Sequence, residues 1–483
     1  MQLSEYHWPS LDEFVNRTAE LARLEDWWQS TDHLPLAMLG RRRVGKSWLF
    51  RRFAHGKPSV LLVAEQLPIS TQLDRFAEVL EPIIGVRPQL RTVGNLVRTL
   101  YRAAARERLL VVIDEFPYLL GSSAAEVAAS TSEVQAALET ERDASHLKLI
   151  VCGSQVSQME AMFGEQNPLH GRLERLAVRP LPYHDATAFL DGIPDPLRRF
   201  ERYCIAGGMP MYLSRLGSGN LRAAVCSNVL DQFTPLWNEG RSLIEQELRE
   251  PRVYLALLER LATGRRQINE LAQHAGLDSA RTSKYLSVLT DLRMVSRSVP
   301  IGAKPDSRDG RWQLDDHFLR FWFRFVFPYQ GDLEGGLDAA GLFDAVVAPD
   351  LADHCAPVFE QWATSWLRAH RSATAVNWGR WWGNAANEHR RAGVRSTEEI
   401  DVVGMNRGRV TAVAECKWTN KSMTPSVVRD LDHYKLPALR DSGLKVSREV
   451  RVLLMCRAGY SDGLERLADQ DQRIELIDVP ASL

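Results

Sequence analysis

The sequence predicts an α/β chain of several domains, and three observations carry that prediction. A short apolar run from Leu34 to Leu39 leads through a glycine-rich loop into a helical pattern, the strand–loop–helix order of a parallel sheet. A second apolar run, residues 109–113, ends in two acids, as buried parallel strands do at the edge where ligands bind. Near the C-terminus, two β-rich apolar runs carry Asp401 and Glu415, so a second sheet is expected there.

Composition limits the class of protein. A chain of 483 residues, 45% hydrophobic and 25% charged, predicts roughly three globular domains. The formal net charge of -1 gives no global attraction to nucleic acid, so such binding requires a local patch. No apolar run is long enough to span a membrane, and the polar segment 1–10 is not a signal peptide. Six cysteines without a CxxC pair indicate a cytoplasmic protein without a disulfide or zinc framework.

The glycine-rich loop is a full GxxxxGK[ST] match in its proper context, between a strand and a helix. Backbone N–H groups of such a loop close around phosphate oxygens, and the start of the following helix favours an anion. Lys46 is expected to reach the β- and γ-phosphates of ATP, and Ser47 to hold Mg²⁺. The residues expected to bind the nucleotide here are Gly40, Arg41, Arg42, Arg43, Val44, Gly45, Lys46, Ser47 and Trp48.

Two further strands end in polar residues that suit phosphate chemistry. Asp114 would complete the Mg²⁺ shell, and Glu115 would polarise the attacking water. Ser154, at the end of the strand 147–152, is a candidate sensor of the γ-phosphate, with a plain strand cap as the alternative. Arg172, in a later loop, is either an arginine finger acting in trans in a homo-oligomer or an ordinary surface arginine.

The order of these motifs resembles that of the archaeal-type P-loop ATPases of the AAA+/STAND assemblage. The resemblance covers residues 10–215 and includes the segment Phe14 to Arg17 before the loop and Gly207 to Pro210 after the sheet. It implies a nucleotide domain over 1–200 and a helical lid over 201–250, with Arg17 near the adenine pocket.

Residues 251–311 predict a winged helix-turn-helix domain. Three short helical patterns are separated by turns at Gly264 and Gly276, and a strand pattern follows the third. Eight basic and four acidic residues between positions 252 and 297 give this part a charge of +4. Contact with DNA and a purely structural role as a spacer both remain open. The positions of the third helix expected to be exposed are Ser279, Arg281, Thr282 and Lys284.

Residues 312–345 predict a connector. The stretch Asp315 to Tyr329 is rich in aromatic residues, which either form a packed hinge core or stack on bases. Its pattern resembles the connector of the same ATPase family. The Gly- and Asp-rich segment Gly331 to Asp344 is the best candidate for a linker.

Residues 346–483 predict an α/β domain with a mixed sheet. Side chains alternate along a strand, so Glu415 and Lys417 share one face while Cys416 points into the core. Carboxylates on adjacent strands, together with a lysine, can hold a divalent metal and activate water against a phosphodiester.

The order Glu360, Asp401, Glu415-x-Lys417 resembles the PD-(D/E)xK nuclease superfamily in the form fused to archaeal-type ATPases, the DUF234 type, with its restriction-endonuclease-like fold. The resemblance implies that Asp401, Glu415 and the Cys416 carbonyl bind Mg²⁺ or Mn²⁺. It implies that Lys417 stabilises the attacking hydroxide and that Glu360 orients metal or water, with help from Tyr434 or Lys435. Ile400 stands where the family motif has proline.

Together these patterns predict an ATP-gated, metal-dependent DNA nuclease. Two alternatives remain: a nucleotide-switched DNA-binding regulator whose nuclease fold is inactive, and an ATP-driven interaction scaffold that does not touch DNA.

Overall fold

The computed structural model describes residues 14–31, 34–248 and 250–483, so the N-terminal segment 1–10 lies outside the described residues. The chain divides into two compact units. The first contains the described residues up to Ala188 together with Gly208–Met211, and the second contains Phe189–Gly207 and Tyr212–Leu483. The predicted domain boundary at residue 200 falls inside a helix of the second unit, α9 (Pro196–Ala206).

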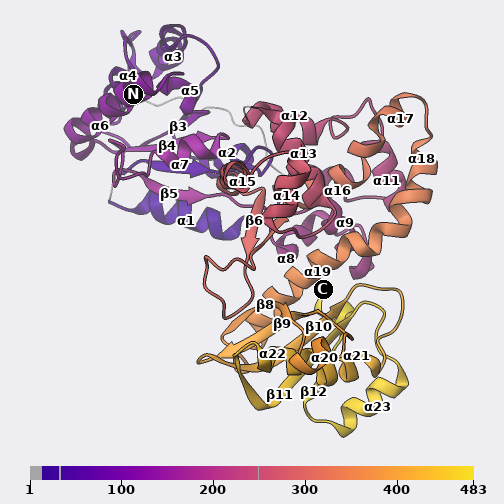
Figure 1. Ribbon diagram of the computed structural model, residues 1–483. Coiled ribbons are helices and arrows are strands. Elements are labelled where there is room, and N and C mark those ends of the chain that lie inside the picture. The colour runs from indigo at the N-terminus through magenta and orange to yellow at the C-terminus, as the bar shows by residue number, and fades with distance from the viewer. Residues whose placement is uncertain (1–13, 32–33, 249) are drawn as a thin grey trace. The chain divides into compact units, whose positions relative to one another are not determined.

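The first unit is built on a five-stranded sheet in the order β2-β3-β4-β1-β5, with every neighbouring pair parallel (Figure 1). This arrangement confirms the predicted parallel sheet. Its strands are β1 (Leu36–Leu39), β2 (Ser59–Val63), β3 (Leu109–Asp114), β4 (Leu147–Gly153) and β5 (Glu174–Ala177). Its helices are α1 (Thr18–Gln29), α2 (Lys46–Ala54), α3 (Ile69–Ile84), α4 (Val93–Ala103), α5 (Pro117–Leu120), α6 (Ala124–Glu141), α7 (Val156–Ala161) and α8 (Tyr183–Ala186).

The strands of this sheet are buried because both faces are covered. Alternate residues of β2, β3 and β4 pack with α3, α4 and α6 in one core cluster. On β4, Lys148 interrupts the apolar pattern, yet its side chain is fully buried. Its Nζ donates to the carbonyl oxygens of Trp27 (2.7 Å) and Ser30 (3.0 Å) at the end of α1. The lysine thus satisfies carbonyls that the helix end leaves without partners, and it fastens α1 to the sheet.

The second unit begins with helices and continues as a winged helix. After α9 come α10 (Pro210–Leu216), whose first two residues belong to the first unit, α11 (Leu221–Asn228) and α12 (Glu239–Glu247). The winged helix comprises α13 (Pro251–Ala262), α14 (Ile268–Ala275), α15 (Ser279–Asp291) and the antiparallel hairpin of β6 (Val295–Ser298) and β7 (Arg311–Leu314).

One expected surface position of this module is wrong. Thr282 on α15 is fully buried, and its hydroxyl donates to the Asp278 carbonyl at 2.8 Å. The side chain satisfies its polar group within its own helix, so it can face the core. Ser279, Arg281 and Lys284 are exposed as predicted.

The aromatic stretch forms a packed core rather than a stacking surface. All the aromatic side chains of α16 (His317–Phe325) from Phe318 to Phe325 are at most 1% exposed. The segment Gly331 to Asp344, expected to be a linker, is instead largely helical. It contains most of α17 (Gln330–Glu334), then α18 (Ala339–Leu342) and the start of a π-helical turn, η4 (Phe343–Val347). Asp338 caps α18 by accepting a hydrogen bond from Gly341 N–H at 2.8 Å.

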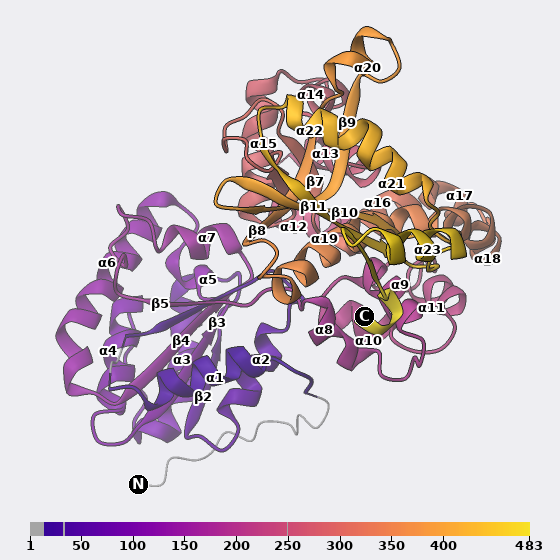
Figure 2. The same cartoon turned by 90° about the horizontal axis from the view of Figure 1, so that it is seen from below.

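The C-terminal part of the second unit is a separate mixed sheet in the order β12-β11-β10-β9-β8 (Figures 1 and 2). β8, β9 and β10 pair antiparallel, whereas β10, β11 and β12 pair parallel. The long helix α19 (Ala348–His370) contacts β8, β9 and β10. The strands are β8 (Asn377–Asn384), β9 (Thr397–Asn406), β10 (Arg409–Lys417), β11 (Lys445–Cys456) and β12 (Ile474–Ile477). The other helices are α20 (Asn387–Arg391), α21 (Ser426–Asp430), the π-helical η5 (Leu431–Lys435), α22 (Leu436–Asp441), α23 (Asp462–Gln470) and α24 (Val479–Ser482).

All six cysteines are free thiols. Among the helices of the described residues, none is long and apolar enough to cross a membrane.

Candidate functional site

The glycine-rich loop lies between β1 and α2, and glycine is required at both of its ends. A side chain at Gly40 would come within 2.6 Å of the Val178 carbonyl oxygen, and Gly45 has a φ of 95°. Lys46 folds back over the loop, where its Nζ donates to the carbonyl oxygens of Gly40 (2.5 Å) and Arg41 (3.2 Å). These ammonium contacts hold the lysine above the loop whose N–H groups would surround a phosphate.

Ser47 and Asp114 meet as the two motifs predicted. The Ser47 hydroxyl lies 3.4 Å from Asp114 Oδ2, and both residues stand at the carboxyl edge of the sheet. Burial, together with the Glu115 charge, raises the pKa of Asp114 above its ordinary value. A cation at this edge would relieve the crowding of the two carboxylates, and the oxygen donors suit Mg²⁺.

Glu115 is partly buried and is hydrogen-bonded to Ser154, the residue that follows β4. Its Oε2 accepts hydrogen bonds from the backbone N–H (3.1 Å) and the hydroxyl (3.0 Å) of Ser154. Its backbone has a φ of 51°, a conformation that costs energy for a residue with a side chain. Ser154 therefore contacts the expected catalytic acid.

Arg17 braces the loop from the N-terminal side. Its guanidinium donates to the carbonyl oxygens of Val44 and Arg179, each at 2.7 Å, and pairs with Glu20 at 2.7 Å. With 5% exposure, the side chain is buried between the glycine-rich loop and the segment after β5. Arg17 therefore lies beside the glycine-rich loop, and its guanidinium donates to protein groups there.

The remaining residues predicted for this site differ in exposure. Trp48 is 49% exposed on the first turn of α2, and Arg43 is exposed on the loop, whereas Arg41 and Val44 are buried. Arg172 forms an ion pair with Glu139 of α6, with Nη2 at 2.6 Å from Oε1.

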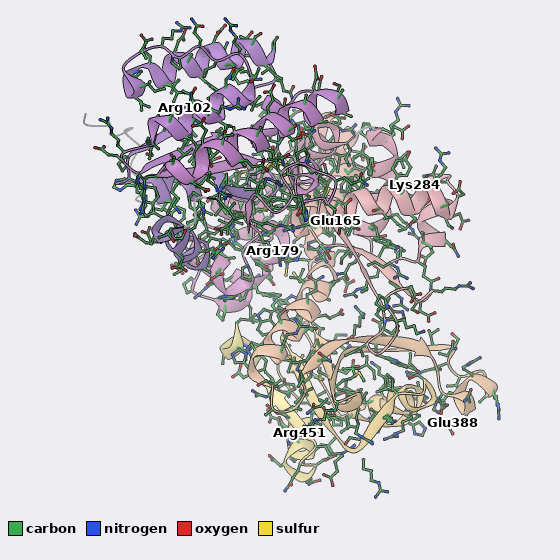
Figure 3. The ribbon with its side chains drawn as sticks, turned by 90° about the vertical axis from the view of Figure 1, so that its left-hand side faces the viewer. Arg102, Glu165, Arg179, Lys284, Glu388 and Arg451 are labelled. Carbon is green, nitrogen blue, oxygen red and sulfur yellow. The ribbon has the colours of Figure 1, made fainter. Side chains whose placement is uncertain are left out.

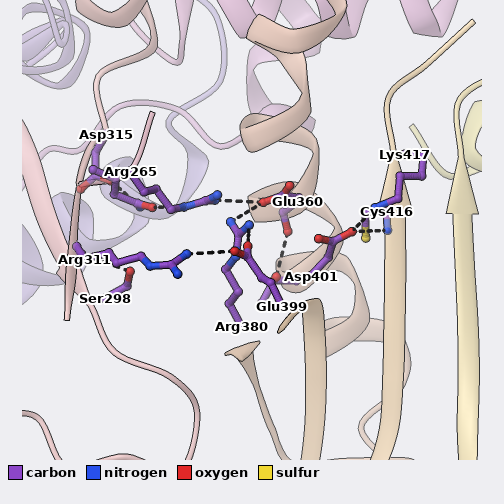
Figure 4. Close-up of polar contacts among 12 residues, drawn as sticks. Arg265, Ser298, Arg311, Asp315, Glu360, Arg380, Glu399, Asp401, Cys416 and Lys417 are labelled. Atoms are coloured by element: carbon purple, nitrogen blue, oxygen red, sulfur yellow. Dashed lines mark hydrogen bonds and ion pairs between the residues drawn. The ribbon is translucent and has the colours of Figure 1, made fainter. Parts of the chain in front are cut away.

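A second group of charged side chains lies where β9 and β10 meet (Figure 4). Lys417 Nζ lies 3.0 Å from Asp401 Oδ2 and 2.9 Å from Glu415 Oε2. The Cys416 N–H donates to the same Asp401 oxygen at 2.9 Å, while the Cys416 thiol is buried on the other face of β10. The expected convergence of two carboxylates and one lysine is therefore present.

Glu415 is almost completely buried, with 1% of its side chain exposed. Lys435, at the end of η5, donates to its Oε1 at 2.6 Å, whereas Tyr434 lies against Arg395. Burial and the Asp401 charge raise the pKa of Glu415. Burial alone would lower the pKa of Lys417, but the Glu415 and Asp401 carboxylates outweigh burial and raise that pKa.

Glu360 lies within reach of the charges of Asp401 and Lys417, and it also contacts two arginines. Its Oε2 accepts from Arg265 Nη2 (2.9 Å), in the turn between α13 and α14, and from Arg380 Nη1 (2.6 Å) on β8. Arg380 also pairs with Glu399 on β9, which accepts from Arg311 Nη1 of β7 at 2.9 Å. Burial and the Asp401 charge raise the pKa of Glu360 to about 7. This alternating network joins the winged helix to the C-terminal sheet (Figure 4).

The donor set between Asp401 and Glu415 suits a divalent cation. An ammonium already lies between two carboxylate oxygens, and Glu415 Oε2 is buried without a well-aligned hydrogen-bond donor. Oxygen ligands of this kind are those that Mg²⁺ and Mn²⁺ prefer. Within the described part of the chain, however, no three His, Cys, Asp or Glu side chains are grouped closely enough to hold a metal by themselves. The Cys416 carbonyl, predicted as a ligand, would have to complete the set.

The winged helix presents exposed cations on α15, where Lys284 stands out from the ribbon in Figure 3. The cations in the turn between α13 and α14 form ion pairs instead. Arg265 contacts Glu360 and Gln313, and Arg266 lies 3.7 Å from Glu270. Arg281 and Lys284 on α15 are therefore exposed cations that an external anion could contact.

Arg380, Glu399 and Arg311 are residues that the sequence reasoning missed. Arg380 is a single basic residue between Gly379 and Trp381, and no short motif marks it. The signal in the sequence was a charged residue within a tryptophan-rich strand. A charge buried among aromatic rings requires a partner of opposite charge.

Two known families match different parts of the chain. Residues 14–216 match a family described as an ATPase domain predominantly from Archaea. Residues 322–427 match DUF234, described as archaeal and bacterial proteins of unknown function. An uncharacterised protein of Methanocaldococcus jannaschii, MJECL04, is 27% identical over 418 residues, which cover 84% of this chain and 87% of that protein.

Among solved structures, the chain is similar to the Walker-type ATPase PABY2304 of Pyrococcus abyssi. The TM-score is 0.50 at 18% identity, over 67% of this chain and 100% of the other. The Aeropyrum pernix ORC2 protein, solved in ADPNP–ADP complexes, gives a TM-score of 0.39 at 15% identity, over 68% of this chain and 96% of that one. At 18% identity, the likeness to PABY2304 shows the fold alone.

Proposed function

We propose that this chain, which joins an ATPase domain of the predominantly archaeal family to a DUF234 domain, is an ATP-regulated DNA nuclease that requires a divalent metal. The observation that carries the proposal is the convergence of Asp401 and Glu415 on Lys417, with both carboxylates within 3.0 Å of its Nζ. The order α19, β8, β9, β10, α21, β11 supplies the helix and the mixed sheet that position these residues.

Asp401, Glu415 and the Cys416 carbonyl would hold Mg²⁺ or Mn²⁺, and that ion would supply an activated water and stabilise charge on the phosphate. The residues of the chain have separable roles. Lys417 is 44% exposed, so its ammonium can turn from the carboxylates toward a phosphate oxygen. Lys435 stays with Glu415 and neutralises part of its buried charge. Cys416 N–H fixes the rotamer of Asp401.

Nucleotide control is proposed through the glycine-rich loop. Lys46 and Ser47 would bind the phosphates and Mg²⁺ of ATP, and Asp114 would share that ion. Glu115 would orient the attacking water after release from Ser154, its present partner. Arg172 would act in trans in a homo-oligomer after exchanging Glu139 for a neighbouring nucleotide.

The test is cleavage of plasmid DNA with Mg²⁺ or Mn²⁺, with and without ATP. Asp401→Ala and Lys417→Ala should each abolish cleavage, and Lys46→Ala should remove its dependence on ATP. Asp469→Ala, at an exposed carboxylate of α23, is the matched control and should cut like the parent. Cleavage that survives Asp401→Ala would rule out this site.

DNA contact by the winged helix is tested separately. Lys284→Glu should weaken binding of a fluorescent duplex and lower its salt dependence, because each lost phosphate contact reduces the counterions released. An unchanged affinity would assign the module a spacer role.

A second candidate is favoured by the contacts of Glu360. Arg265 and Arg380 already neutralise this acid, which is the arrangement expected if the nuclease fold only binds DNA. In that case the protein is a nucleotide-switched regulator. Calorimetric titration distinguishes the two, because the regulator should bind no Mn²⁺ at millimolar concentration even with DNA present.

A further inference from the structure

A cavity of about 550 Å³ lies in the second unit, apart from the acidic cluster. Its walls come from α9, from α11 and from the start of α19, together with residues that follow β10 and β11. Figure 2 shows α9 and α11 near each other in this unit. Four of its lining residues are arginines, Arg198, Arg202, Arg222 and Arg457, and its lining contains one carboxylate, Glu201.

Arg202 is a buried cation without an ion-pair partner in the described part of the chain. It is 3% exposed, and its guanidinium donates to the backbone carbonyls of Leu216 (2.5 Å) and Gly219. Its Nε has no hydrogen-bond partner among the described residues. Burial lowers the pKa of Arg202, as expected for a charge removed from water without a counter-ion. An anion in the cavity would supply that counter-ion.

Glu201 organises two other arginines rather than cancelling the charge. Its Oε1 accepts from Arg457 Nη2 at 2.7 Å and its Oε2 from Arg198 Nη1 at 3.1 Å. Arg222 pairs with Asp344 at 2.6 Å. Arg198 also lies 3.9 Å from Asp195, so the four arginines and their three carboxylate partners leave one positive charge in excess. The guanidinium fork matches phosphate oxygens, and Arg457 is fixed in place over the Trp418 ring.

The lining also contains apolar side chains, among them Phe343, Pro349 and Leu351. A cavity lined by both cations and apolar groups fits a ligand that carries phosphate on a flat or apolar body. We propose that this cavity binds a phosphate ester of nucleotide size, either a free nucleotide or the terminal phosphate of a nucleic-acid strand. The site does not depend on nuclease activity in the C-terminal domain.

The test is calorimetric binding to the full-length Lys46→Ala variant, in which the glycine-rich loop no longer retains nucleotide. The probes are inorganic pyrophosphate, ADP, and a short oligonucleotide with and without a 5′-phosphate. At least one phosphate probe should bind, and the 5′-phosphate comparison distinguishes a strand end from a free nucleotide. No binding of any probe at millimolar concentration would overturn the proposal.

Charge reversal locates the binding. Arg198 and Arg222 are 60% and 46% exposed, so Arg198→Glu with Arg222→Glu should leave the fold intact, as circular dichroism can verify. This double variant should weaken binding by about tenfold or more, since two charge-assisted contacts are lost. Arg451→Glu, which reverses a 49% exposed arginine of β11 outside the cavity (Figure 3), is the matched control and should bind normally. Equal weakening by the control, or none by the double variant, would overturn the site.

Discussion

The ion pair between Arg265 and Glu360 is predicted to fasten the winged helix to the C-terminal sheet. Its charged atoms are 2.9 Å apart, and the two side chains are 16% and 15% exposed. Two unit charges about 4 Å apart interact by roughly 4 kcal/mol at an effective dielectric constant of 20. Because Arg380 shares the same carboxylate oxygen, we expect about half of this value, a coupling free energy of about 2 kcal/mol.

A double-mutant cycle measures this coupling. Arg265→Ala, Glu360→Gln and the double variant are unfolded in urea and followed by tryptophan fluorescence. The pH should be 8 or above, because the pKa of Glu360 is about 7 and the carboxylate must be charged. The exposed pair Arg222–Asp344, 46% and 57% exposed, is the matched control and should show less than about 1 kcal/mol. A coupling below about 0.5 kcal/mol for Arg265–Glu360 would refute the reasoning, because the network would then contribute no attachment.

Three further predictions concern single residues. Glu115→Gln should lower ATP hydrolysis by about a hundredfold or more while nucleotide affinity changes little, as phosphate release and a fluorescent nucleotide would show. Lys148→Met should destabilise the first unit by about 2–4 kcal/mol in urea unfolding, because the carbonyls at the end of α1 lose their buried donor. Burial holds the pKa of His354 well below its ordinary value, so the folded state remains unprotonated while the unfolded chain takes up a proton. The contribution of His354 to the unfolding free energy should therefore fall below about pH 6.5, with a limiting slope of about 1.4 kcal/mol per pH unit, and the difference between the parent and His354→Gln measures that slope.

The nucleotide half was predictable because its chemistry follows local order along the chain. Strands β1 and β3 are built on short apolar runs, and the polar residues that matter lie at the end of a strand or directly after it, as at Asp114 and Ser154. The partner of Glu115 was not predictable, because both Ser154 and the nucleotide are within reach of a strand end. The burial of Lys148 could not be predicted either, because the carbonyl groups that stabilise its ammonium belong to a helix far away in the sequence.

The acidic cluster was predictable in part. Alternation along β10 placed Glu415 and Lys417 on one face, and the strand pairing brings Asp401 beside them. The position of Glu360 depended instead on which module packs against α19. No local pattern indicates that a turn of the winged helix supplies Arg265, since that contact joins residues 95 positions apart. The prediction of a linker was wrong because Asp338 caps α18 and η4 has an apolar face, so that this Gly- and Asp-rich segment forms helices.

If ATP affects the acidic cluster, one route for that effect is the chain itself, which runs from one unit into the other. One crossing is the pair Gly207–Gly208. Gly208 belongs to the first unit, where its carbonyl accepts from Leu181 N–H at 2.7 Å and a side chain would meet the Leu181 backbone at 1.9 Å. Gly207 has a φ of 62° and ends α9. Both glycines are therefore required by backbone geometry.

Beside that joint, α9 contacts the residues that follow β10 and β11. Phe200 of α9 packs on the ring of Trp418, with ring centroids 4.7 Å apart, and Trp418 directly follows Lys417. One residue further along α9, Glu201 pairs with Arg457 after β11. A rotation of α9 about the glycine pair would thus act on the ends of β10 and β11 at once. Control by nucleotide then requires no contact between the glycine-rich loop and the acidic cluster, because the helix that begins the second unit already touches the segment next to Lys417.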